Sequence, residues 1–315
     1  MSKKNKPLFE VTQQDLDRQT GLNQERIDTT LFILPENDGE AARSVQILRA
    51  LGAPFIHVSA QKWGATLDKE WSKLNLGTLN KVKNVLIFEM PGEQVGDSIE
   101  TEEKLKAHGV DLHIVDHHYY QWVDRHHTKA SIEQLCEYLG WQMGEIDQAI
   151  AVNDRSYIPG MKALNIPKET IIRVRLFDLE SQGNKRNYID KQLKQARKDI
   201  ESLREKKHGD LWVLDDPDHK QPYIMQELAI EDPIGLIHAL EIKPHKVGFS
   251  GKPEVVQFLM KQDWSTWQDQ TGPLISYGGG DARSSQFWGL KISDSGSKIT
   301  PELVSWVSQK VKEYF

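Results

Sequence analysis

Ten residues decide the fold, Val110-Asp111-Leu112-His113-Ile114-Val115-Asp116-His117-His118-Tyr119. The first part of this segment alternates apolar and polar side chains, with β-branched residues among the apolar ones, which predicts a β-strand. The strand ends in an acid and two histidines, which are side chains that can bind a metal ion. Open α/β sheets bind ligands outside the carboxyl ends of their strands. The segment therefore predicts a functional site; the alternative is a polar turn whose histidines are only caps.

Two earlier apolar runs also end in carboxylates. Residues 29–34 predict a buried strand followed by Glu36 and Asp38, and residues 85–88 predict another followed by Glu89. Helical patterns between the strands imply a mostly parallel sheet with helices on both faces, which is an α/β fold. Parallel strands have their carboxyl ends at one edge of the sheet. We therefore expect these three acids to share a site with the Asp-His-His segment.

Asp154 is a further candidate acid. It follows a second helix-like or half-buried segment over residues 146–152. Its alternative role is to cap the helix that comes after it.

Two domains are predicted from the length of the chain and from a change in its composition. The chain has 315 residues, more than one ordinary hydrophobic core accommodates. Residues 180–185 contain no apolar side chain, residues 189–207 predict a highly charged helix, and a mixed α/β pattern resumes at residue 211. We expect an N-terminal domain over 1–183, a linker helix over 184–208 and a smaller α/β domain over 209–315.

The second domain holds a glycine-rich segment, Tyr277-Gly278-Gly279-Gly280-Asp281-Ala282-Arg283-Ser284-Ser285. Consecutive glycines let backbone amides approach an anion closely, and the arginine and serines add hydrogen-bond donors. The segment predicts a loop that binds phosphate or carboxylate. The alternative is a β-bulge or a hairpin turn.

Composition excludes several classes of function. The net charge of -6 argues against binding to extended duplex nucleic acid, and leaves a small or short anionic substrate. No apolar run approaches the ~20 residues of a membrane helix, and the basic start of the chain lacks the apolar part of a secretory leader, so we expect a cytoplasmic protein. The single cysteine, Cys136, cannot form an internal disulfide and is expected to be a small packed residue.

Carboxylates and a histidine at one sheet edge are a ligand set for Mn²⁺ or Mg²⁺. Two such ions about 3.5–4 Å apart can generate a hydroxide and stabilise a phosphoryl group under attack. The sequence therefore predicts hydrolysis of a phosphoester or phosphoanhydride.

The order of these motifs resembles that of the DHH phosphoesterase superfamily with a C-terminal DHHA1 domain. The resemblance runs through nearly the whole chain from Thr29, and its most specific part is Val115-Asp116-His117-His118. That superfamily includes RecJ-type exonucleases, nano-RNases, cyclic-di-AMP phosphodiesterases and, with a different second domain, manganese pyrophosphatases. The resemblance implies hydrolysis of a small phosphorylated substrate or short single-stranded oligonucleotide. It also implies two Mn²⁺ or Mg²⁺ ions, with one ion as the alternative.

The resemblance further implies roles for individual residues. Asp116 and His118 would be catalytic, with His118 touching the scissile phosphate. The metal ligands would be Glu36, Asp38, Glu89, His117 and Asp154. The contacts to substrate would be made by Gly279, Gly280, Asp281, Arg283 and Ser284.

The chain departs from the superfamily at four positions. Phe32 stands where many members have a histidine four residues before the first acid, Glu36 and Glu89 replace aspartates, and Asp281 replaces a histidine after the glycines. Each longer acid displaces a ligand oxygen, and metal geometry is sensitive to such displacements. Two further hypotheses follow. One is a weak or inactive relative that binds a nucleotide or a protein partner, and the other is a single-metal hydrolase using Asp38, Glu89, His117 and Asp154.

Overall fold

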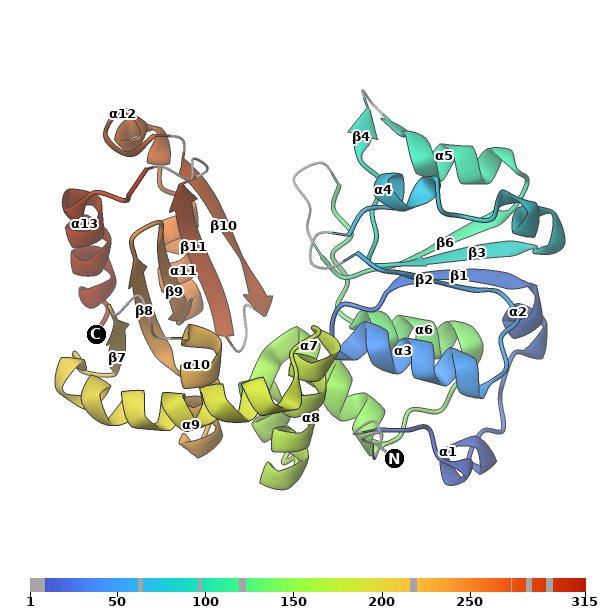
Figure 1. Ribbon diagram of the computed structural model, residues 1–315, viewed down its shortest axis with the longest axis horizontal. Coiled ribbons are helices and arrows are strands. Elements are labelled where there is room, and N and C mark those ends of the chain that lie inside the picture. The colour runs from blue at the N-terminus through green and yellow to red at the C-terminus, as the bar shows by residue number, and fades with distance from the viewer. Residues whose placement is uncertain are drawn as a thin grey trace. The chain divides into compact units, whose positions relative to one another are not determined.

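The computed structural model describes residues 9–61, 65–95, 98–118, 123–215, 220–272, 274–281, 285–292 and 297–315. For residues 94, 95, 98, 269, 271, 277–281 and 285 the description covers the backbone. The chain divides into two compact units, Met1–Asp154 with Ile172–Lys185, and Arg155–Ile171 with Arg186–Phe315. Figure 1 shows the elements of both units.

The first unit is built on a parallel sheet with the strand order β2-β1-β3-β6. Its strands are β1 (Thr30–Pro35), β2 (Ile56–Ser59), β3 (Asn84–Phe88) and β6 (Asp111–Val115). Phe32 on β1 pairs with Ile56 and Leu86, and Leu86 pairs with His113 on β6. The parallel sheet is confirmed, and the carboxyl ends of its four strands meet at one edge.

Helices cover both faces of this sheet, as the sequence predicts (Figure 1). α3 (Gly39–Ala50) and α6 (Ser131–Leu139) lie on one face, and α4 (Leu67–Trp71) and α5 (Glu100–Ala107) lie on the other. Alternate side chains of β1 point to opposite faces, so Phe32 joins the core under α3 and α6 while Ile33 joins the core under α4 and α5. Cys136 is buried in the first of these cores, as expected.

Shorter elements and two long helices complete the N-terminal half of the chain. These elements are α1 (Gln13–Asp17), α2 (Gln24–Thr29), η1 (Leu76–Lys81), β4 (Gln94–Val95), β5 (Ser98–Ile99), α7 (Glu145–Ala163) and α8 (Lys168–Ser181). α7 loses helical geometry at Tyr157, where φ is 53° and ψ is -150°, two residues before Pro159, which has no N–H to donate. Asp154 therefore lies inside a helix, three residues before a kink, and does not cap a new one.

The second unit contains a five-stranded mixed sheet with the order β10-β11-β9-β8-β7. Its strands are β7 (Leu211–Leu214), β8 (His238–Lys243), β9 (Lys246–Gly251), β10 (Leu274–Asp281) and β11 (Ser285–Ile292). Only the β7–β8 pair is parallel among these described strands. Its helices are α9 (Arg186–Leu203), η2 (Arg204–Lys206), α10 (Gln221–Glu231), α11 (Pro253–Met260), η3 (Trp264–Trp267), α12 (Gln268–Thr271) and α13 (Pro301–Lys312). Apolar side chains of α11 and α13 pack with the sheet in one core.

The predicted linker helix corresponds to α9 and belongs to the second unit by its contacts. Arg197 on α9 forms an ion pair with Glu227 on α10, and the rings of Tyr188 and Tyr223 meet edge to face at 6.3 Å. The assignment of separate catalytic and substrate-binding roles to the two parts of the chain stays a prediction. Among the described helices, none has the length and apolar character needed to cross a membrane.

Candidate metal centre

The first strand end of the parallel sheet leads into α3 through an acidic turn. Asp38 is the N-cap of α3, and its Oδ1 accepts a hydrogen bond of 2.8 Å from the Ala41 amide. Glu40 lies in the first turn of α3, where the helix dipole favours a negative charge. Its Oε1 accepts a hydrogen bond of 2.6 Å from the Ile132 amide at the start of α6. Both acids are buried, so their charges need a partner.

The Asp-His-His segment follows β6 and folds back on its own carboxylate. Oδ1 of Asp116 accepts hydrogen bonds from the amides of His117 and His118, at 2.8 and 3.0 Å. It also accepts one of 3.0 Å from Nδ1 of His118. Asp116 is buried, whereas the His118 side chain is 43% exposed. Asp116 therefore fixes the turn and the tautomer of His118, and leaves that imidazole accessible to a substrate.

Glu89 follows β3 and adopts a left-handed backbone conformation with φ of 49°. Residues other than glycine seldom adopt this region, and such positions cluster at functional sites. The Glu89 amide donates to the carbonyl of Val115 at 3.0 Å, which fastens it to the end of β6. The strained backbone is thus held in place by the neighbouring strand.

Four buried donor atoms converge on one point beside these strand ends. Nε2 of His117 lies 2.7 Å from Oδ2 of Asp154, 3.3 Å from Oε1 of Glu89 and 3.7 Å from Oε2 of Glu40. All four atoms lie within 4.8 Å of one another. Apart from these mutual contacts, none of them has a hydrogen-bond partner in the described part of the chain.

This arrangement fits a divalent cation. Six donors placed about 2.1 Å from a metal ion are about 3.0 Å from their neighbours and about 4.2 Å from the donor opposite. The distances from His117 to the three acids fall in or near that range. A second group of possible ligands, Glu89, His117 and His118, shares two members with the first. The residues present therefore suit one ion closely and offer fewer separate ligands to a second.

Electrostatics in the cluster show an excess of negative charge. Burial raises the pKa of Asp38 and of Glu40 well above the usual range, and the charges of Glu89 and Asp154 raise both further. Burial disfavours a charged His117, but its hydrogen bonds with Asp154 and Glu89 outweigh that and raise its pKa to about 10. Burial also opposes ionisation of Asp154, yet the contact with His117 lowers its pKa. Without a metal ion, the positive charge beside these acids is that of protonated His117. A divalent cation would supply the positive charge instead.

The structure brings three of the five predicted metal ligands, Glu89, His117 and Asp154, into the cluster. Asp38 is outside the cluster and caps α3, although the charges of Glu89 and Asp154 raise its pKa. Glu36 lies in the turn before α3, is half-buried and has no hydrogen bond or ion pair with described residues. Glu40, which the sequence reasoning missed, supplies the oxygen instead. The sequence Asp38-Gly39-Glu40 could have indicated Glu40, because it places a second acid two residues after an N-cap acid.

The histidine expected four residues before the first acid is absent whichever acid is counted as the first. That position is Phe32 when the count starts from Glu36, and Leu34 when it starts from Asp38. Leu34 and Phe32 are both fully buried in the core under α3 and α6. Neither position offers a ligand, which agrees with the sparse second group of donors.

The glycine-rich segment differs from the expected loop. Gly278, Gly279 and Gly280 lie within β10, where Gly279 pairs with Phe287 of β11, and Asp281 ends the strand. β10 is an edge strand among the described strands, so part of its backbone is not used by β11. Arg283 and Ser284 lie outside the described residues.

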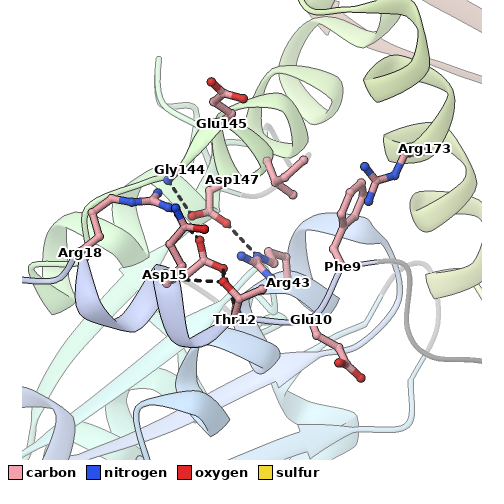
Figure 2. Close-up of a pocket in the computed structure, with 12 residues that line it drawn as sticks. Phe9, Glu10, Thr12, Asp15, Arg18, Arg43, Gly144, Glu145, Asp147 and Arg173 are labelled. Atoms are coloured by element: carbon pink, nitrogen blue, oxygen red, sulfur yellow. Dashed lines mark hydrogen bonds and ion pairs between the residues drawn. The ribbon is translucent and has the colours of Figure 1, made fainter.

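A cavity of about 640 Å³ in the first unit is separate from the metal cluster (Figure 2). Its lining includes Arg18, which pairs with Asp15 at 3.1 Å, and Arg43, which pairs with Asp147 at 2.8 Å. None of the predicted site residues lines it. The third arginine of the lining, Arg173, lies over the ring of Phe9, with its Cζ 4.8 Å from the ring centroid.

Comparisons with known proteins give structural matches of low similarity. No protein-family profile and no curated protein sequence matches the chain. A crystal structure of exonuclease RecJ bound to manganese aligns with a TM-score of 0.41 and 13% identity, over 93% of this chain and 91% of that one. RecJ of Thermus thermophilus aligns with TM-scores of 0.44 in complex with Mn²⁺ and 0.40 with Mg²⁺, both at 13% identity. These alignments cover 96% of this chain and 56% or 54% of the RecJ chains. At this level of similarity the matches assign no activity to this chain.

Proposed function

We propose that the protein is a divalent-metal-dependent phosphoesterase. The observation that carries this proposal is the convergence of Glu40, Glu89, His117 and Asp154, whose inward atoms have only one another as partners among the described residues. A cluster of this kind is costly to bury unless a cation completes it. Carboxylates with an imidazole favour Mn²⁺, while Mg²⁺ remains compatible with the acids.

The high-affinity ion belongs in the four-residue group. Glu89, His117 and His118 form the weaker, overlapping group for a second ion. When bound, the metal supplies a hydroxide at neutral pH and neutralises charge on the phosphoryl oxygens. Phosphoryl transfer suits this division because its catalysis depends mainly on positioning and charge stabilisation.

The residues of the protein have distinct tasks in this proposal. Asp116 holds His118 through Nδ1, so that the exposed imidazole can contact the scissile phosphate. Asp38 stabilises the start of α3 and adds negative charge beside the ligands. In the second unit, substrate binding is assigned to Gly279, Gly280, Asp281, Arg283 and Ser284.

The proposed substrates are small or short phosphorylated molecules, such as a short single-stranded oligonucleotide or a cyclic dinucleotide. The net charge of -6 supports a short substrate over an extended duplex. A cytoplasmic location fits such substrates and is proposed with them.

A second candidate function is a catalytically weak or inactive protein that binds a nucleotide or a protein partner. It is favoured by the apolar side chains at Phe32 and Leu34, which leave the second ion with fewer ligands. The two candidates differ in metal content and in turnover.

Metal stoichiometry after EDTA treatment and reloading with Mn²⁺ tests the proposal. Wild type and His117→Ala are compared by elemental analysis, and each is then assayed with short oligonucleotides, cyclic dinucleotides and pyrophosphate. One or two ions per wild-type chain, reduced in the variant, together with hydrolysis of one of these substrates, support a metallohydrolase. Metal binding without turnover supports the binding protein. Absence of Mn²⁺ binding would overturn the metal-dependent proposal.

A further inference from the structure

A buried ion pair on α8 forms hydrogen bonds with the residues next to two acids of the metal cluster. Nη1 of Arg175 donates to Oδ2 of Asp178 at 2.7 Å, and both residues are on α8. Their side chains are 6% and 11% exposed. A pair this deep costs desolvation and adds little net stability, so its contacts need another explanation.

Asp178 reaches the acidic turn at the start of α3. Its Oδ1 accepts a hydrogen bond of 3.0 Å from the amide of Gly39, the residue between Asp38 and Glu40. The approach is close, because a Cβ at Gly39 would lie 3.1 Å from Cα of Asp178. Asp178 thus fixes the backbone from which both acids of this turn project.

Arg175 reaches the second ligand-bearing segment. The same Nη1 donates at 3.1 Å to Oδ1 of Asn153, the residue before Asp154 on α7. One continuous chain of hydrogen bonds therefore runs from Gly39 through Asp178 and Arg175 to Asn153. It joins the backbone beside Glu40 to the residue beside Asp154, two acids that face each other in the cluster.

We propose that Arg175 and Asp178 are positioning residues that set the spacing between Glu40 and Asp154 for the metal ion. This inference rests on the proposed function, since it concerns the same cluster. Groups that hold metal ligands in place through hydrogen bonds affect metal affinity by about 10- to 100-fold when they are removed. A merely structural pair would instead lower stability and leave affinity unchanged.

The chain offers a matched control pair. Arg43 on α3 and Asp147 on α7 form an ion pair of 2.8 Å whose side chains are 3% and 2% exposed (Figure 2). The remaining hydrogen bonds of Asp147 come from the Trp141 indole and the Gly144 amide, at 3.1 and 3.0 Å. The control pair connects the same two helices without touching Gly39 or Asn153.

The test is the Mn²⁺ affinity of EDTA-treated wild type, Asp178→Asn and Asp147→Asn, measured by calorimetry beside the denaturant midpoint of each apoprotein. We expect both variants to be destabilised, and the Mn²⁺ dissociation constant to rise about 10- to 100-fold in Asp178→Asn alone. Equal effects of the two substitutions on affinity, or no effect of Asp178→Asn, would overturn the inference.

A second variant separates position from charge. Arg175→Met with Asp178→Ala removes one positive and one negative charge together and, unlike Asp178→Asn, leaves no side-chain oxygen to accept from the Gly39 amide. Positioning predicts that its Mn²⁺ affinity stays as low as that of Asp178→Asn, whereas wild-type affinity would assign the effect to charge and overturn the inference. If wild type itself binds no Mn²⁺, the proposed function fails as well. Metal binding by wild type with unchanged variants contradicts the positioning role alone.

Discussion

Two matched substitutions, Glu40→Gln and Glu36→Gln, test which of these two acids is a ligand of the proposed metal ion. The substitution Glu40→Gln keeps the size of the side chain and an oxygen at its end, but removes the charge that faces His117. The substitution Glu36→Gln makes the same chemical change in the turn two residues before Asp38. Because Glu36 makes no polar side-chain contact with described residues, its replacement should leave the cluster intact.

The expected loss of metal affinity follows from the distances in the cluster. Oε2 of Glu40 lies 3.7 Å from Nε2 of His117. A histidine binds a metal as the neutral imidazole, so in the metal-bound state the charge of Glu40 would face the ion and not His117. The net cost of removing one charge from a buried, hydrogen-bonded group is about 2–5 kcal/mol. The amide oxygen of glutamine retains part of the interaction, so we expect the lower end, a rise of about 30-fold in the Mn²⁺ dissociation constant.

The same substitution should stabilise the apoprotein. The pKa of Glu40 is raised in the folded state by burial and by Asp154 and Glu89, so its ionised form destabilises the fold at pH values above about 4.5. Glu40→Gln removes that cost, and the gain should disappear as the pH falls and the wild-type carboxyl becomes protonated in both states. Urea unfolding of EDTA-treated protein at pH 7.5 and pH 4.5 measures the difference.

Calorimetry with Mn²⁺ completes this experiment. Weak binding by Glu40→Gln beside wild-type binding by Glu36→Gln is the expected result. Strong binding by Glu40→Gln with loss in Glu36→Gln would refute the register argued from the structure and restore Glu36 as a ligand.

Three further perturbations have definite expected outcomes. His117→Ala should lower Mn²⁺ content in elemental analysis, whereas His127→Ala, in an exposed loop, should not; equal content in both would contradict the cluster. Burial opposes ionisation of Glu70, but four side-chain hydrogen bonds outweigh it and lower its pKa to about 2. Glu70→Gln should therefore lower the free energy of unfolding by up to about 3 kcal/mol at pH 7, a difference that narrows between about pH 4.5 and 2 in urea unfolding. Thr300→Ala removes the N-cap of α13 and should cost about 1 kcal/mol, so an unchanged denaturant midpoint would argue against the cap.

The parallel sheet was predictable because its strands are short apolar runs bounded by polar turns. β1, β3 and β6 each appear within one residue or so of the predicted ends. Leu67, Trp71 and Leu74 recur at helical intervals within residues 63–76 and predict a longer helix than α4, Leu67–Trp71, which the structure has; residues 62–64 lie outside the described part. β8 and α10 escaped prediction, because neither has the strict alternation or the single apolar stripe on which such predictions rely.

The glycine-rich segment shows how tertiary context overrides local preference. Glycine has a low intrinsic preference for strands, so three in a row predict a turn or a loop. In the structure, pairing with β11 along the whole of β10 holds these residues extended, from Leu274 opposite Ile292 to Asp281 opposite Ser285. The sequence of residues 277–281 contains no local pattern that predicts pairing with so long a partner strand.

The candidate site was predictable in kind and less so in register. Asp116, His117 and His118 follow one strand directly. Because these three metal-binding residue types are consecutive, the sequence alone predicts a metal site there. The acidic turn contains Glu36, Asp38 and Glu40 at equal spacing, and the sequence alone does not say where α3 begins. The start of that helix decides which acid points to His117; there Asp38 accepts from the Ala41 amide and the distant Asp178 accepts from the Gly39 amide.

The left-handed backbone at Glu89 has a consequence for engineering this protein. A glycine there would relax the main chain, and Glu40→Gln would remove a buried carboxylate whose ionisation the fold opposes. Libraries selected for heat resistance in the presence of a chelator would therefore accumulate changes at these positions and lose the metal centre. Selection with Mn²⁺ present would reverse the preference, since a bound ion stabilises the folded state in proportion to its affinity.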